Sequence, residues 1–137
     1  MPKQTTDVSA ATYGIIYSGP GETWSVAKGV TVEGDSGAVL SIYASSTLVN
    51  RGLLTSDGYG LYFAFDGGPV EIANSKTGVI DAYRAVYLSG YDLDLTFRNA
   101  GLIEGSEFAV SVVGGASGSF ANKGTISADL VAVEFDL

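Results

Sequence analysis

Carboxylates are the side chains in this chain that could do acid–base or metal chemistry. The sequence has 15 Asp and Glu residues, 7 Lys and Arg residues, and neither histidine nor cysteine. A Ser-His-Asp or Cys-His system is therefore excluded, as is a metal site built on thiolates or imidazoles. What is left for catalysis is a carboxylate pair such as Asp57 and Asp81. Retaining glycosidases place such a pair about 5 Å apart.

The acidic side chains recur along the chain, and this favours a structural interpretation over a catalytic one. In order they are Glu33 or Asp35, Asp57, Asp81, Glu104 or Glu107, and Asp129. In a solenoid any side chain repeated once per coil lies about 5 Å from its neighbour, so proximity does not identify a catalytic pair. No calcium-binding nonapeptide accompanies the carboxylates. We therefore expect no catalytic residue, no metal site and no cofactor, with cation binding along the acidic corner as the alternative.

One asparagine recurs with similar neighbours and defines a repeat. The copies are Asn50-Arg-Gly-Leu-Leu, Asn99-Ala-Gly-Leu-Ile and Asn122-Lys-Gly-Thr-Ile, and Asn74-Ser-Lys-Thr-Gly-Val-Ile has two extra residues. The period is about 23–25 residues. A small residue followed by an aliphatic one recurs with the same period: Gly14-Ile15, Ala38-Val39, Gly60-Leu61, Ala85-Val86, Ala109-Val110 and Ala132-Val133. Two unlike columns with one period predict a repeat architecture.

The residues between these columns predict short strands. In one repeat the candidates are residues 78–80, 85–88 and 93–97, and Leu93, Leu95 and Phe97 alternate with polar residues. No segment has sustained helical periodicity. We expect an all-β fold, a right-handed parallel β-helix (β-solenoid) of about five to six rungs with three short strands each. It should be a single domain over residues 1–137, with repeats in 11–137 and residues 1–10 as a tail or cap.

The repeated positions have structural explanations. We expect Asn50, Asn74, Asn99 and Asn122 to form a ladder in which amides hydrogen-bond from rung to rung, and asparagine also tolerates left-handed backbone at a corner. The glycine that follows each asparagine should supply a positive φ or room for close backbone approach. Two inward columns should form the core: Ile15, Val39, Leu61, Val86, Val110 and Val133, then Tyr17, Phe63, Leu88, Val112 and Phe135. Trp24 should close the N-terminal end.

One outward column is apolar where a solvated column would be polar. It contains Ile16, Leu40, Tyr62 and Tyr87, which we call the apolar stripe, and it continues as Ser111 and Glu134. A contiguous exposed apolar patch often marks an interface. The stripe is therefore the candidate interaction surface, and the alternative is that residues 1–10 cover it.

The repeat resembles the N-x-G-x-I solenoid repeats of autotransporter passenger domains and of haemolysin-type secreted bacterial proteins, over residues 11–137. This resemblance implies an extracellular or cell-surface location, although no signal peptide is visible in the sequence. No apolar stretch is long enough for membrane insertion. The net charge of −8 argues against nucleic acid as a partner.

These observations predict a non-enzymatic, secreted or surface structural protein whose partner is itself. Copies would stack end to end into filaments, pack laterally through the stripe, or do both. The alternatives are a carbohydrate-binding or carbohydrate-cleaving β-helix, with glycans as partners of its eight tyrosines, and a module of a larger adhesin.

Overall fold

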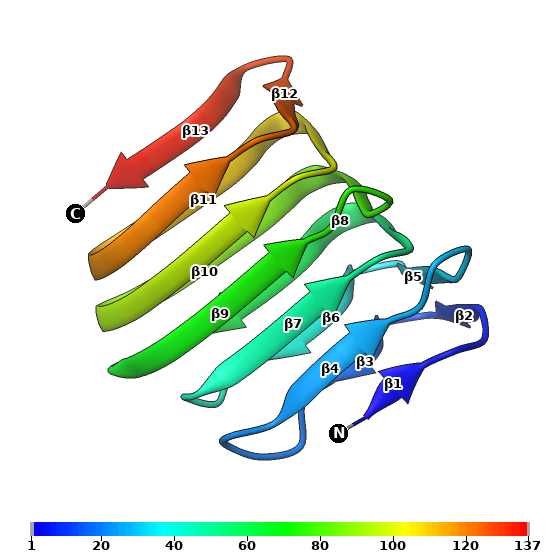
Figure 1. Ribbon diagram of the computed structural model, residues 1–137, viewed down its shortest axis with the longest axis horizontal. Coiled ribbons are helices and arrows are strands. Elements are labelled where there is room, and N and C mark those ends of the chain that lie inside the picture. The colour runs from blue at the N-terminus through cyan, green and yellow to red at the C-terminus, as the bar shows by residue number, and fades with distance from the viewer. Residues whose placement is uncertain (1, 137) are drawn as a thin grey trace.

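Every regular element among the described residues is a β-strand, as the repeat predicts (Figure 1). The computed structural model describes residues 2–136, so the predicted limits at residues 1 and 137 lie outside the described part. The strands are β1 Lys3–Gln4, β2 Val8–Ala10, β3 Tyr13–Ile16, β4 Thr23–Val26, β5 Thr31–Gly34, β6 Gly37–Ser41, β7 Ser46–Asn50, β8 Leu53–Ala64, β9 Gly68–Asn74, β10 Val79–Asn99, β11 Leu102–Asn122, β12 Thr125–Ala128 and β13 Val131–Asp136. No helix in this described range could cross a membrane.

The strands coil into a right-handed solenoid in which all strand pairs are parallel (Figure 1). Three walls run along its axis. Wall A contains β1, β4, β7, β9, residues 93–99 of β10 and residues 116–122 of β11. Wall B contains β2, β5, the starts of β8, β10 and β11, and β12. Wall C contains β3, β6, the later parts of β8, β10 and β11, and β13. The predicted fold class is therefore confirmed.

The strands are longer than expected because the corner between walls B and C does not break β8, and neither that corner nor the one between walls C and A breaks β10 and β11. β10 and β11 each have 21 residues and pass through more than one wall. The pairing register shifts between Ala82 and Arg84 and again between Gly90 and Leu93. An extra residue of this kind is a β-bulge, which bends a strand while pairing continues on either side.

The predicted inward columns form the core in the coils before the last, and a serine that the repeat pattern does not predict occupies one level of the second column. Ile15, Val39, Leu61, Val86 and Val110 are at most 2% exposed. In the second column Ser41 pairs with Phe63 and follows the pair Ile16–Leu40, so it occupies the level between Tyr17 and Phe63. The small serine leaves room for the Tyr17 ring to reach Phe63, with centroids 5.5 Å apart. Burying each large apolar side chain stabilises the fold by about 1.5–3 kcal/mol.

Wall A has an aromatic and aliphatic column of its own. Trp24, Leu48, Ile72, Phe97 and Phe120 follow one another in register. The rings of Phe97 and Phe120 stack with centroids 4.6 Å apart. Trp24 is half-buried against the core at the N-terminal end, and its indole N–H donates to the Glu22 carboxylate. Trp24 therefore lies where it was expected.

The four asparagines form a continuous amide ladder. The side-chain Nδ2 of Asn50 donates to Asn74 Oδ1 at 2.9 Å, and the Asn74–Asn99 and Asn99–Asn122 bonds are both 2.8 Å. Asn50, Asn74 and Asn99 are at most 2% exposed. The expectation of left-handed backbone is wrong, because Ser45 and Asp92 are the non-glycine residues with positive φ in the described chain. Amide bonding alone explains these asparagines.

The glycine beside the ladder mostly serves close packing. A Cβ atom on Gly101 would lie 2.2 Å from the carbonyl oxygen of Gly78 in the preceding coil. In this column Gly29 has a positive φ, of 81°. A side chain in the other coils would force neighbouring backbones apart, so space and not φ selects glycine there.

The segment that we expected to be a tail or cap is paired. β1 pairs with β4 in wall A, and β2 pairs with β5 in wall B. These strands start the first coil, and neither lies over the apolar stripe, which is in wall C. The stripe is therefore not covered by β1 or β2.

Candidate functional site

The carboxylate pair suggested by the sequence does not form. The register places Asp81 beside Thr55 on one side and beside Glu104 on the other. Asp57 is two residues beyond Thr55. The two extra residues after Asn74 lengthen the corner of that coil, so equal distances from the asparagine do not bring equal positions together. The expectation that Asp57 and Asp81 are adjacent is wrong.

The acidic residues form no continuous column. The residues that pair in register with Asp81, from coil to coil in wall B, are Glu33, Thr55, Glu104 and Ser127. The acidic side chains are therefore interrupted by Thr55 and end before Ser127. Asp81 and Glu104 are exposed and, with Asp129, line a shallow depression. Within residues 2–136, no group of three or more acidic, His or Cys side chains is arranged to hold a metal ion. These carboxylates have the geometry of solvated surface charges.

The apolar stripe is in register on the outside of wall C. Ile16 pairs with Leu40, Leu40 with Tyr62, and Tyr62 with Tyr87. Ile16 is 54% exposed. The other three members, Leu40, Tyr62 and Tyr87, are less exposed than Ile16 and are half-buried. The rings of Tyr62 and Tyr87 lie 5.3 Å apart between centroids.

Two further rings enlarge the stripe into an aromatic face. The Tyr59 ring lies 4.7 Å from that of Tyr62 and 5.5 Å from that of Tyr87, and Phe108 lies 5.9 Å from Tyr87. Burial is the first cause that raises the pKa of the Tyr62 hydroxyl above its usual value, and the neighbouring Tyr59 adds to it. We call Tyr59, Tyr62, Tyr87 and Phe108 the aromatic face.

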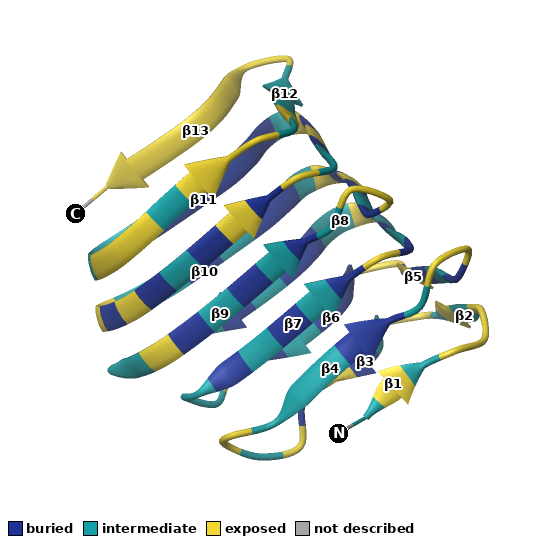
Figure 2. Cartoon of the chain, in the orientation of Figure 1, coloured by how far each residue is buried: buried dark blue, intermediate teal, exposed yellow. Residues whose placement is uncertain are grey.

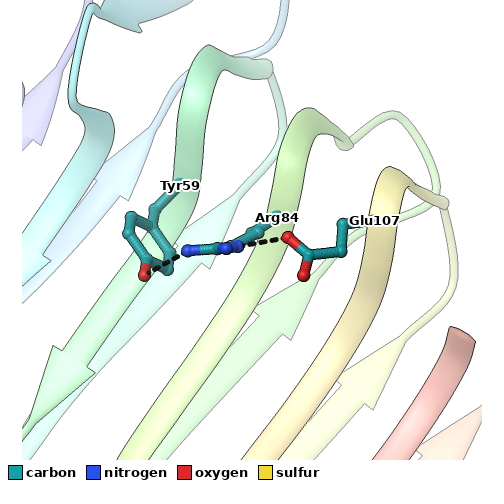
Figure 3. A network of polar contacts seen from close by, with 3 residues as sticks. All are labelled: Tyr59, Arg84 and Glu107. Atoms are coloured by element: carbon teal, nitrogen blue, oxygen red, sulfur yellow. Dashed lines mark hydrogen bonds and ion pairs between the residues drawn. The ribbon is translucent and has the colours of Figure 1, made fainter.

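One arginine links this face across three coils (Figure 3). Arg84 Nε donates to Glu107 Oε2 at 2.5 Å, and Arg84 Nη1 donates to the Tyr59 hydroxyl at 3.0 Å. The hydrogen bond to Glu107 is the largest cause that raises the pKa of Arg84 above its usual value. The two charged side chains are 37% and 32% exposed, so the pair orients the edge of the face but stabilises the fold only weakly.

Sequence reasoning missed Tyr59, Arg84 and Phe108, and it named Glu107 only as an alternative member of the acidic column. The bulge gives β8 and β11 one residue more than β10 between the paired positions, so a fixed period does not align these side chains. A usable signal was present. Tyr59, Arg84 and Phe108 each come immediately before the small–aliphatic pair that defines the repeat.

The C-terminal coil is the other distinctive surface. All six residues of β13 are exposed, which Figure 2 shows as an unbroken yellow strand. Val133 and Phe135 continue the two inward columns but are 38% and 46% exposed. The expectation that they are core residues is therefore wrong, because among the described residues no further coil covers them.

The backbone edge of this coil is also open. In the described chain β12 and β13 each pair with β11 and with no other strand. A parallel strand that is paired on one side directs alternate N–H and C=O groups outward on the other. An exposed edge with apolar side chains readily accepts another strand.

The N-terminal coil also has an open backbone edge, because in the described chain β1, β2 and β3 each pair with one strand, but its inward side chains are covered. Ile15 and Tyr17 are each 2% exposed there, and the Tyr17 hydroxyl donates to the backbone carbonyl of Thr47. The two ends of the solenoid therefore differ, and the apolar surface is concentrated at the C-terminal end. No protein-family model, no curated protein and no solved structure matches the chain.

Proposed function

We propose that this is a non-enzymatic structural protein that self-associates through its C-terminal coil. The observation that carries the proposal is the exposure of Val133 and Phe135, whose counterparts in most other coils are fully buried. A contact that covers these side chains gains hydrophobic free energy, and strand pairing at the same edge satisfies open backbone groups. The proposal includes the expected extracellular or cell-surface location, whose support is the resemblance of the repeat.

Charge opposes association and gives it a characteristic salt dependence. The chain carries a net charge of −8, and Glu134 and Asp136 lie on β13 itself. Like charges repel over about 10 Å at 0.1 M salt and over much less at 1 M. Apolar and backbone contacts are not screened in this way. Self-association should therefore strengthen as salt is added.

Two substitutions on β13 test the proposal with matched charge. Phe135→Lys and Glu134→Gln each make the chain more positive by one charge, but only Phe135 is in an inward column. We expect static light scattering to show wild type and Glu134→Gln well above the monomer mass of 14.1 kDa, increasing with concentration. Phe135→Lys should stay monomeric.

Phe135 is already about half exposed, so its replacement leaves the other coils intact, as circular dichroism can verify. A wild-type protein that stays at 14.1 kDa at every concentration and salt level would overturn the proposal. Equal association of the two variants would overturn the role of the inward column.

Lateral packing through the apolar stripe is the second route of association. Tyr62→Lys combined with Tyr87→Lys should abolish side-by-side bundles but leave association through β13. Electron micrographs distinguish the two, because bundles are wider than single rods. Bundles that persist in the double variant would exclude the stripe as the lateral contact.

Saccharide binding on the aromatic face is a second candidate function. The observation in its favour is that the rings of Tyr59, Tyr62 and Tyr87 lie beside the polar groups of Arg84 and Glu107. Aromatic rings pack against apolar faces of a ligand while neighbouring polar groups fix its orientation. We do not propose cleavage, because the Asp57–Asp81 pair does not form.

A glycan array tests this second candidate directly. Tyr87→Ala should abolish binding to any glycan that wild type retains. The control is Tyr91→Ala, because Tyr91 is 69% exposed and makes no ring contact with the aromatic face. Equal loss in both variants, or no binding by wild type, would contradict it.

A further inference from the structure

We infer that self-association continues the solenoid in register, with the first coil of one copy following the last coil of another. The inference rests on the proposed function and specifies its geometry. The competing geometry places two C-terminal coils face to face as a closed dimer. Three observations favour the head-to-tail arrangement.

The first observation is that the column of the asparagine ladder has an amide side chain in the first coil and another in the last coil. Gln4 pairs with Val26 and Val26 with Asn50, so Gln4 occupies the asparagine column in the first coil. At the other end, Asn122 Oδ1 accepts from Asn99 Nδ2 at 2.8 Å and from the backbone N–H of Gly124 at 3.1 Å. Asn122 Nδ2 has no hydrogen-bond partner among the described residues.

These two amides complement each other only head to tail. The Gln4 side chain donates through Nε2 to the carbonyl oxygen of Thr6 at 2.7 Å, which leaves Oε1 as an acceptor. Within the ladder each Nδ2 donates to the oxygen of the next coil. Asn122 Nδ2 and Gln4 Oε1 repeat that bond across the contact. Two C-terminal coils face to face would oppose one free donor to another.

The second observation is that the end coils carry matching side chains in wall B. Following the register from β2 through β5, β8, β10 and β11 to β12 places Val8, Ser9 and Ala10 at the level of Ile126, Ser127 and Ala128. Aliphatic residues meet in one column and alanines in another. The first coil therefore has the side chains that a coil following β12 requires.

The third observation is electrostatic. In a continued register Glu134 lies over Ile16, because both belong to the column that contains Leu40, Tyr62, Tyr87 and Ser111. Face-to-face coils would instead bring Asp129, Glu134 and Asp136 of both copies together. Repulsion of that kind costs most at low salt.

Engineered cysteines test the register without background, because the chain contains none. In a continued register Ser9 of one copy is the parallel neighbour of Ser127 of the other, about 4.8 Å away, within the Cα separation that a disulfide accepts. Ser9→Cys combined with Ser127→Cys should give a series of disulfide-linked oligomers on a non-reducing gel. Ser9→Cys with Thr125→Cys is the control, because two residues of offset move the cysteines beyond about 7 Å.

The single variant Ser127→Cys reports the competing geometry in which the two-fold axis passes by β12, because a head-to-tail register keeps the copies of Ser127 a whole protein apart. Strong dimer formation by that variant, or equal oligomer formation by the offset control, overturns the inference. If light scattering shows assembly but the Ser9–Ser127 pair does not link, the register is wrong while the proposed function stands. If no variant assembles, both fail.

The amide contact has a separate readout in the strength of association. Gln4→Ala should weaken it about fivefold, the loss expected for one net hydrogen bond. Gln4→Glu keeps an acceptor oxygen and should associate more strongly than Gln4→Ala in salt that screens its charge. Equal association of Gln4→Ala and wild type would remove Gln4 from the contact.

Discussion

Removal of one interior rung of the amide ladder should destabilise the fold in a way that depends on its place in the ladder. Asn99 donates through Nδ2 to Asn122 Oδ1 at 2.8 Å and to the carbonyl oxygens of Thr125 and Gly101 at 3.2 and 3.3 Å. Its Oδ1 accepts from Asn74 Nδ2 at 2.8 Å and from the Gly101 N–H at 3.2 Å. Asn99→Ala removes all of these bonds.

The size of the effect depends on which partners are left unpaired. Asn74 Nδ2 keeps the carbonyl oxygens of Gly78 and Leu102, but the Gly101 N–H loses its partner. A typical hydrogen bond contributes about 1 kcal/mol net, and an unpaired buried donor costs about 1–3 kcal/mol. We therefore expect Asn99→Ala to lower the free energy of unfolding by about 2–4 kcal/mol, without loss of any ligand-binding activity.

Asn122→Ala is the internal control. Asn122 is exposed, so water can replace its oxygen as the acceptor for the Gly124 N–H, and Asn99 Nδ2 keeps the carbonyl oxygens of Thr125 and Gly101. The expected cost is therefore less than about 1 kcal/mol. Urea unfolding followed through Trp24, the single tryptophan, measures both variants. A Phe135→Lys background keeps association from adding to the apparent stability. Equal costs for Asn99 and Asn122, or stability unchanged by Asn99→Ala, would refute the structural role of the ladder.

Three further predictions concern packing, pH and metal ions. Gly101→Ala should destabilise the fold by about 1–3 kcal/mol, because its Cβ would overlap a backbone oxygen, whereas Gly19→Ala should be nearly neutral, because nothing lies within 4 Å of that Cβ; equal urea midpoints would contradict this. Burial raises the pKa of Tyr17, so the folded chain keeps a proton that the unfolded chain loses above about pH 10, and stability should fall as pH rises beyond that value. Tyr17→Phe should lessen this alkaline loss of stability. An equal decline in urea midpoint for Tyr17→Phe and wild type, between about pH 8 and about pH 11, would contradict the prediction. Calcium or chelator should shift the melting temperature only slightly, and a large shift in a thermal melt would indicate a metal site.

The fold could be predicted because side chains in contact recur once per coil. The ladder was predicted from Asn50, Asn74 and Asn99, because each coil needs the same amide at the same corner. The core was predicted in the same way from Val39, Leu61 and Val86. Composition and periodicity were enough to identify walls and inward columns.

The surface could be predicted less well because it depends on local offsets. The longer corner after Asn74 separated Asp57 from Asp81, and the bulge before the small–aliphatic pair concealed Tyr59 and Arg84. The exposure of Phe135 depends on whether another coil lies over its own, which its sequence pattern does not encode. Periodicity predicts which side chains are neighbours along the solenoid axis, but it does not predict which coil is covered by another.

Sedimentation velocity of the wild-type protein tests the central claim most directly. The protein would be run over about a hundredfold range of concentration, because association by mass action is then visible as a shift in species. We predict a series of rods whose sedimentation coefficient and frictional ratio increase together with concentration and with salt. A single species of 14.1 kDa at every concentration and salt level would contradict self-association through the C-terminal coil.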